Sequence, residues 1–213
     1  MQPGSSAPLD APAALVSDSF SELVGRIASP ALNPGAGATA ALVTTLAAAL
    51  VVKVARRSIG EWPEAGSVVA QAECLRRRAA PLAEANALAY ERARDALGAV
   101  GGSGAADPPR LPPEPAGDLP ASLEAAAAVP LRIAEVAADV VELAAAATEH
   151  AVHDVRPDAL TAACLADACV NGAAALVEVN LGVTRSGERW ERAQALRLQS
   201  TRRRPSMINE DAG

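Results

Sequence analysis

Apolar positions recur at helical rather than strand spacing along most of the chain. Residues spaced by three, four or seven positions share one face of an α-helix. Two segments show this spacing over several turns, 64–97 with Leu75, Leu82, Ala89, Ala93 and Leu97, and 122–150 with Val129, Ile133, Val136, Val140 and Leu143. The pattern predicts six helices, over residues 19–29, 38–59, 64–97, 122–150, 158–181 and 186–201.

Local signals set several of the helix ends. Ser19 and Glu22 stand three residues apart and form a capping-box pattern, which predicts the start of the first helix. Asp158 is predicted to be the N-cap of the fifth helix. Pro81 and Pro130 fall inside predicted helices and are expected to kink or split them, because proline lacks a backbone N–H.

The second helix is apolar nearly all round. Residues 38–52 carry three threonines and otherwise only apolar side chains before Lys53 ends the run. Such a helix is typical of the centre of a bundle. The run is shorter than the roughly 18 residues that would indicate a membrane span, so a buried helix and no membrane association are predicted. Because six helices in a small chain leave part of this surface uncovered, a homodimer formed through helix faces is also expected.

One segment interrupts the helical pattern for more than twenty residues. Residues 98–120 are rich in glycine and proline and are predicted to form a long exposed loop. A domain boundary there is the alternative, but neither side offers a complete core. We therefore predict one helical domain over 17–201, with a disordered leader at 1–16 and a disordered tail at 202–213.

Composition supports an all-α, up-and-down bundle. Half of the residues are hydrophobic, while the only aromatic residues are Phe20, Trp62, Tyr90 and Trp190, so the core must consist of alanine, leucine and valine. Alanine favours helices, whereas sheets rely on β-branched and aromatic residues. The net charge of −6 argues against a general nucleic-acid-binding protein. An odd number of cysteines, three, and the absence of a signal-peptide pattern at the start predict reduced thiols and a cytoplasmic protein.

The turn before the second helix is the first candidate site. The sequence SPALNPGAGATAAL, residues 29–42, places proline and glycine before a helix start that carries no large side chain. The unpaired N–H groups of such a helix start attract carboxylates, phosphates and developing oxyanions. The spacing does not match a phosphate-binding P-loop, so nucleotide binding is disfavoured. The alternative is that the glycines only allow a tight turn between two helices.

Histidine, cysteine and acidic residues that could bind a metal occur in two short stretches. His150, His153 and Asp154 lie close in sequence, but at a helix end, where solvated polar residues are common. Cys164 and Cys169 are five residues apart, which is not the usual zinc spacing, so core packing is favoured. No metal site is predicted.

Several motifs together resemble a known family, the cyclodeaminase/cyclohydrolase enzymes related to the C-terminal domain of formiminotransferase-cyclodeaminase. The resemblance covers about residues 17–190. The matching stretches are SPALNPGAGATAAL at 29–42, EANALAY at 84–90, RPDALTAACLADACVNGAAALVEVNLG at 156–182, and within it the pair Asn180 and Leu181. The resemblance implies an all-helical enzyme that hydrolyses methenyl-tetrahydrofolate, or cyclises formimino-tetrahydrofolate with release of ammonia. It also implies a dimer that needs no metal or redox cofactor.

The resemblance also implies roles for individual residues. Asp158 stands where the family has a Ser-Asp aspartate, and is expected to orient or deprotonate water and to stabilise a cationic carbon. Asn86 stands where an acidic residue is expected and would keep a hydrogen bond to substrate. The predicted substrate-binding residues are Pro34, Gly35, Ala36, Gly37, Thr39, Lys53 and Arg57. The loop at 35–39 and Asp158 are expected to line one pocket.

Two departures from the family pattern leave three interpretations open. The loop reads Gly-Ala-Gly-Ala and lacks the family's serine, and Asn86 replaces the acidic residue. The first interpretation is an active folate one-carbon enzyme. The second is an impaired member that binds folate or a partner protein. The third is a helical assembly protein whose resemblance reflects only alanine-rich helices.

Overall fold

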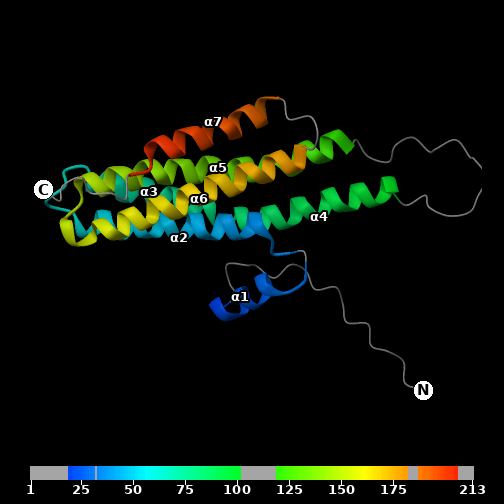
Figure 1. Cartoon of the computed structure of the whole chain (residues 1–213). Helices are drawn as coiled ribbons and strands as arrows, with labels where there is room; N and C mark the ends of the chain where they lie inside the picture. Colours follow the sequence, from blue (N-terminus) through cyan, green and yellow to red (C-terminus); the bar gives the residue numbers. More distant parts are fainter. Residues whose placement is uncertain (1–18, 32, 102–118, 182–186, 206–213) are drawn as a thin grey trace, which may run out of the picture.

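The computed structural model describes residues 19–31, 33–101, 119–181 and 187–205, and in these it contains helices and no strand. The elements, in chain order, are α1 (Phe20–Ala28), α2 (Ala36–Arg57), α3 (Ala65–Ala79), α4 (Leu82–Gly101), α5 (Leu119–His150), the short 3-10 helix η1 (His153–Val155), α6 (Arg156–Leu181) and α7 (Glu188–Arg203). The predicted all-α bundle is confirmed (Figure 1). The predicted leader lies outside the described residues, as do 102–118 of the predicted loop and 206–213 of the predicted tail. The described ends of the predicted loop and tail are helical instead: 98–101 belong to α4, 119–120 to α5 and 202–203 to α7.

The two internal prolines have different effects. At Pro81 the predicted helix 64–97 splits into α3 and α4. At Pro130, by contrast, α5 continues without a break. A proline inside a helix cannot donate a hydrogen bond to the carbonyl four residues earlier. Whether the helix continues therefore depends on whether that carbonyl finds another donor.

The capping box at the first helix is confirmed: the Ser19 side chain accepts from the Glu22 backbone N–H, and Glu22 bonds back to Ser19. The predicted N-cap role of Asp158 is wrong. Helix α6 begins two residues earlier, directly after η1, and Asp158 lies inside its first turn. A carboxylate in the first turn still interacts favourably with the helix dipole.

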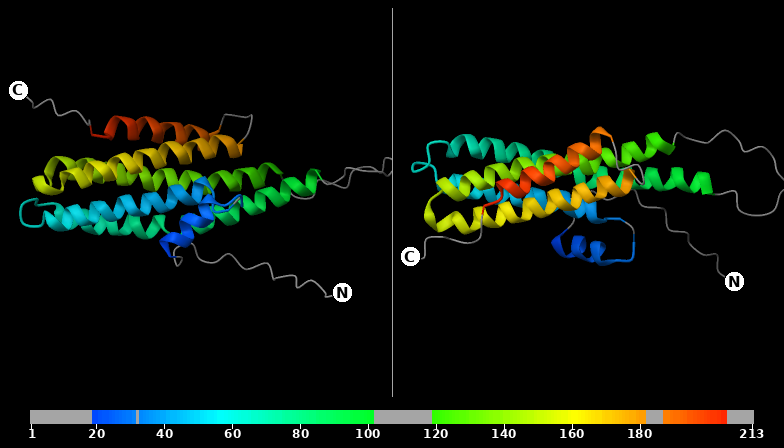
Figure 2. Two further views of the ribbon diagram at one scale, coloured as in Figure 1. Left: turned by 60° about the horizontal axis from the view of Figure 1, so that its bottom comes forward. Right: turned by 45° about the horizontal axis from the view of Figure 1, so that its top comes forward.

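The core is built from small side chains, which allow close approach of the helices. Helices α5 and α6 pack along each other, α2 contacts α3, α4, α5 and α6, and α5 also contacts α7 (Figure 2). Ten of the 22 residues of α2 are buried, whereas Leu46 on the same helix is 59% exposed. Helix α2 is therefore an inner helix with one uncovered apolar position, and it shares the centre of the bundle with α5.

Helix α1 lies beside the bundle rather than in it (Figures 1 and 2). None of its residues is buried, and Phe20 is 78% exposed. Only the half-buried Leu23 packs against the core. The helix is strongly amphipathic, yet the apolar side chains of Phe20, Val24 and Ile27 stay exposed in the part of the chain that the structure describes.

Two stretches, Ala36–Arg57 and His153–Leu181, are long and apolar enough to cross a membrane by length and composition. The expectation that the apolar stretch of α2 is too short to span a membrane is wrong, because the helix has 22 residues. Inner helices of globular bundles have the same length and apolar composition. In α2, 50% of the most apolar window is buried inside the bundle, and in His153–Leu181 the buried share is 44%. Length and composition therefore do not distinguish a core helix from a membrane span here.

Candidate functional site at the start of helix α2

A cavity of about 220 Å³ lies where the start of α2 meets three other helices. Its lining comes from the turn before α2, from α4, from the middle of α5 and from the end of α6. The lining residues are Asn33, Gly35, Ala36, Gly37, Asn86, Tyr90, Ala126, Pro130, Leu176, Val179 and Asn180. Three carboxamides and a phenol therefore provide its polar side chains.

The first turn of α2 offers backbone donors to this cavity. Gly35 is the N-cap and makes no side-chain capping bond. The Thr39 backbone N–H and hydroxyl both donate to the Gly35 carbonyl, at 3.0 and 3.1 Å. The N–H groups that precede Thr39 in the helix have no intrahelical acceptor, because an α-helix leaves its first N–H groups unpaired. They carry the partial positive charge of the helix start.

Asn86 lies directly against this helix start. A β-carbon added at Gly37 would overlap with the side-chain amide of Asn86. Tyr90 follows Asn86 by one helical turn on α4 and lines the same cavity. The structure therefore brings Asn86, a candidate substrate-binding residue, to the 35–39 loop.

The turn itself is fixed to α4 on its other side. The Asn33 amide donates to the Glu91 carboxylate at 3.0 Å. Pro34, which follows a cis Asn33–Pro34 peptide, is buried. These contacts hold the turn over the face of α4 that carries Asn86 and Tyr90.

Asn180 closes the cavity from the end of α6. Its Nδ2 donates to the Ala126 backbone carbonyl at 2.9 Å. Ala126 is four residues before Pro130, so its carbonyl is the one that proline leaves without a helical donor. A contact from α6 to α5, between residues 54 positions apart in sequence, thus satisfies the carbonyl.

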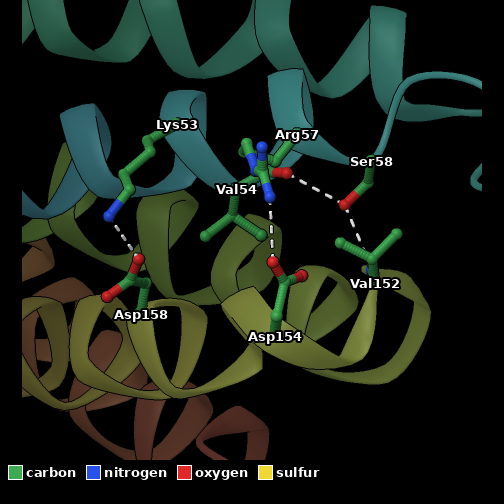
Figure 3. Close-up of polar contacts among 7 residues, drawn as sticks. All are labelled: Lys53, Val54, Arg57, Ser58, Val152, Asp154 and Asp158. Atoms are coloured by element: carbon green, nitrogen blue, oxygen red, sulfur yellow. Dashed lines mark hydrogen bonds and ion pairs between the residues drawn. The ribbon is translucent and has the colours of Figure 1, made fainter.

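Asp158 is not part of this cavity, and the predicted pocket shared with the 35–39 loop is wrong. Its carboxylate binds the Lys53 ammonium at 2.6 Å (Figure 3). Lys53 lies sixteen residues after Gly37 on α2, which corresponds to about 24 Å along the helix axis. Asp158 therefore belongs to the opposite end of α2.

Lys53 and Arg57, both predicted to bind substrate, also lie at that far end. Arg57 pairs with Asp154 at 2.9 Å, and both side chains are largely exposed. Next to them the buried Ser58 hydroxyl donates to the Val54 carbonyl and accepts from the Val152 N–H (Figure 3). In this structure Lys53 and Arg57 link the end of α2 to η1 and the start of α6, rather than facing the cavity.

The histidines and cysteines show contacts unrelated to metal binding. The His150 ring packs on Trp62 with ring centroids 5.9 Å apart. Cys169 is buried, and its burial raises the thiol pKa more than a hydrogen bond with Thr44 lowers it. Within the described ranges, no group of three or more histidine, cysteine or acidic side chains is arranged to hold a metal ion.

Comparison with known proteins assigns the chain to a family. The sequence profile of the formiminotransferase-cyclodeaminase family matches residues 19–196. This chain belongs to the formiminotransferase-cyclodeaminase family. A comparison with curated proteins found no match.

The fold of this formiminotransferase-cyclodeaminase family member agrees with a solved structure. It is similar to the crystal structure of a formiminotetrahydrofolate cyclodeaminase from Thermotoga maritima, with a TM-score of 0.70 and 21% sequence identity. The match covers 89% of this chain and 97% of the other. The family match excludes the interpretation that the resemblance reflects only alanine-rich helices.

Sequence reasoning missed Asn33, Tyr90, Ala126 and Pro130 as cavity residues of this family member and used Asn180 only as a motif. A usable signal was present in the predicted topology. In an up-and-down bundle the second and fifth predicted helices run in opposite directions, so the end of the fifth lies beside the start of the second. This topology brings Asn180, rather than Asp158, to the 35–39 loop.

Proposed function

We propose that this chain is a folate one-carbon enzyme of the cyclodeaminase/cyclohydrolase type. The proposed substrate is methenyl- or formimino-tetrahydrofolate, whose one-carbon end would enter the cavity at the start of α2. The observation that carries the proposal is the meeting of the Gly35–Gly37 turn, Asn86 and Asn180 at one cavity in a member of this family. The cavity is smaller than the roughly 300–1,000 Å³ of sites that enclose a whole ligand, so the rest of the folate would lie outside it.

The polar groups of the cavity suit both reactions. Each reaction passes through a tetrahedral carbon between two folate nitrogens. Backbone N–H groups at a helix start stabilise an oxygen that gains negative charge, as the attacking oxygen does when it becomes the formyl oxygen. Carboxamide oxygens of Asn86 and Asn180 would accept hydrogen bonds from N–H groups of a formimino substrate. The cavity thus offers donors for hydrolysis and acceptors for cyclisation.

A second candidate function is folate binding without efficient turnover. It is favoured by one observation: among the described residues that line the cavity there is no carboxylate or histidine to accept a proton. Glu91 contacts one lining residue, Asn33, and is held by that hydrogen bond. A missing general base lowers rates by about 10²–10⁴-fold.

The deciding experiment is a pair of assays on the purified chain. One follows the loss of methenyl-tetrahydrofolate absorbance, and the other follows ammonia released from formimino-tetrahydrofolate. Asn180→Ala is the test variant, and Asn171→Ala is the control because Asn171 also lies on α6 but bonds to the Asp167 carbonyl outside the cavity. Turnover that is lost in Asn180→Ala and kept in Asn171→Ala supports the enzyme.

The other outcomes are distinct. Tetrahydrofolate binding without turnover in either assay supports the second candidate. If calorimetry detects no binding of tetrahydrofolate, methenyl-tetrahydrofolate or formimino-tetrahydrofolate, and neither assay shows turnover, both candidate functions are wrong.

We also propose that the protein acts as a cytoplasmic homodimer without a metal or redox cofactor. The exposed apolar residues Phe20, Leu46 and Val179 support a partner surface, since Val179 is 73% exposed beside the cavity. Light scattering that gives the mass of one chain at micromolar concentration would contradict the dimer.

A further inference from the structure

Pro130 occupies an unusual place in the longest helix. It is fully buried in the interior of α5, which continues on both sides of it. A proline there is strongly unfavourable relative to alanine, because it has no N–H to donate to the helical carbonyl. The carbonyl that loses this donor belongs to Ala126, which is only 5% exposed and cannot rely on water.

The donor that replaces the missing N–H comes from Asn180, at 2.9 Å from the Ala126 oxygen. A carbonyl oxygen can only accept, so the amide nitrogen of Asn180 must face it. This requirement fixes the orientation of the carboxamide, with Nδ2 towards the Ala126 carbonyl and Oδ1 away from it. The oxygen Oδ1 and the second N–H of the amide remain for the cavity that Ala126, Pro130 and Asn180 line together.

We propose that Pro130 is a positioning residue, which orients the Asn180 carboxamide so that Oδ1 accepts a hydrogen bond from an N–H of the folate one-carbon group. This substrate role rests on the proposed function, whereas the orientation itself does not. An ordinary residue at position 130 would donate its own N–H to Ala126, so the carbonyl would no longer need the Asn180 amide as its donor and the amide would be held less firmly. Proline is the only common residue without this N–H.

The test compares the wild type with Pro130→Ala and Pro130→Val. Both variants restore the backbone N–H, and valine also keeps most of the volume of the ring. The side-chain amide signal of Asn180 in ¹⁵N spectra of the protein alone is assigned from its loss in Asn180→Ala. In the wild type, the hydrogens of this amide should exchange slowly with solvent. They should exchange fast in both variants, while thermal stability stays equal or rises.

Turnover provides the second readout. Loss of one hydrogen bond to a cationic substrate group should lower kcat/KM for formimino-tetrahydrofolate about tenfold or more in both variants. In the Asn180→Ala background, Pro130→Ala should cause no further loss. If Pro130 only fills space in α5, the opposite pattern is expected. Pro130→Val should then restore turnover, and the losses caused by Pro130→Ala and Asn180→Ala should add.

Each part of the inference can fail separately. Unchanged slow exchange of the Asn180 amide in Pro130→Ala overturns the orientation, whatever the activity. Fast exchange with unchanged kcat/KM overturns the substrate role. A wild type that neither turns over formimino-tetrahydrofolate nor shifts its Asn180 signal on addition of tetrahydrofolate overturns the proposed function and the substrate role together, and leaves the orientation decided by the exchange measurement.

Discussion

The side chain of Asn86 fills the space that a β-carbon at position 37 would occupy. The distance from such a carbon to the Asn86 amide would be under 3.0 Å, which real side chains essentially never show. Asn86 can lie on the first turn of α2 only because residue 37 is glycine. The glycine therefore serves a close approach of two elements, in addition to any role in the turn.

Gly37→Ala is expected to push the Asn86 amide away from the helix start and to reduce folate turnover. Stability should change little or rise, because alanine favours a helix by about 1 kcal/mol over glycine. The control is Gly66→Ala, since Gly66 is likewise the second residue of its helix, α3, and has nothing near the position of its β-carbon. Equal turnover in both variants, with equal unfolding temperatures, would contradict the argued role of residue 37.

Most of the helices were predictable because their signals are local. Periodicity gave the elements, the Ser19–Glu22 capping box gave the start of α1, and Pro81 gave the break between α3 and α4. Pro130 was not predictable in the same way. Whether a proline breaks a helix depends on the fate of the Ala126 carbonyl, and its donor lies 54 residues away in sequence.

The candidate site was half predictable. Motifs identified the small-residue turn and Asn86 as candidate residues, and the helical fold brings the two into contact. Asp158 was placed in the same pocket from a motif alone, without regard to the length of α2. A helix of 22 residues separates its two ends by about 33 Å, so a residue at the start of α6 cannot reach both.

The cysteines are expected to differ in reactivity with iodoacetamide at neutral pH. Cys74 is exposed and should be alkylated first, while Cys169 should be protected in the folded protein. Burial raises the pKa of the Cys169 thiol, so the thiolate that reacts is scarcer at a given pH. Mass spectrometry of peptides after a short pulse measures the order. Labelling of Cys169 as fast as Cys74 would mean that α6 separates from α2 on the timescale of the pulse.

Helix α7 is expected to detach more easily at high salt. Only Ala193, Leu196 and Ser200 of this helix are buried. Arginines join it to α5 and α6 through partly exposed ion pairs, Arg189–Glu124, Arg192–Glu135, Arg197–Glu178, Arg203–Glu142 and Arg204–Asp167. Raising the salt from 0.1 M to 1 M shortens the screening length from about 10 to about 3 Å, and each exposed pair contributes at most about 1 kcal/mol.

Hydrogen exchange should therefore accelerate at high salt across Glu188–Arg203. The amides of residues 38–52 in α2 are the internal control, because this part of the helix packs through apolar contacts and has no charged side chain. Protection of α7 that does not depend on salt would show that the buried contacts of Ala193, Leu196 and Ser200, whose hydroxyl donates to Asp167, hold the helix without the ion pairs.

Asp158→Asn is expected to leave folate turnover nearly unchanged. The variant removes the ion pair with Lys53, whose side chain is 58% exposed, so the loss of stability should stay within about 1 kcal/mol. A chemical denaturation curve measures this loss, and the two folate assays measure turnover. Abolished turnover at normal stability would mean that Asp158 acts in the reaction from outside the α2 cavity.

Asn86→Asp is the substitution expected to raise turnover. It places a carboxylate at the start of α2, where the partial positive charge of the helix favours the ionised form and offsets part of its desolvation. The carboxylate can accept a proton, which the amide cannot, and general-base catalysis contributes about 10²–10⁴-fold. Turnover of methenyl-tetrahydrofolate should therefore rise well above the wild type at neutral pH and fall towards it as the introduced carboxylate is protonated in acid. The control is Asn171→Asp, which adds the same charge on α6 outside the cavity and should leave the rate unchanged. If the wild type already turns over rapidly and Asn86→Asp changes nothing, the amide at position 86 already fulfils the role of the family's acidic residue, and the folate-binding alternative without efficient turnover is wrong.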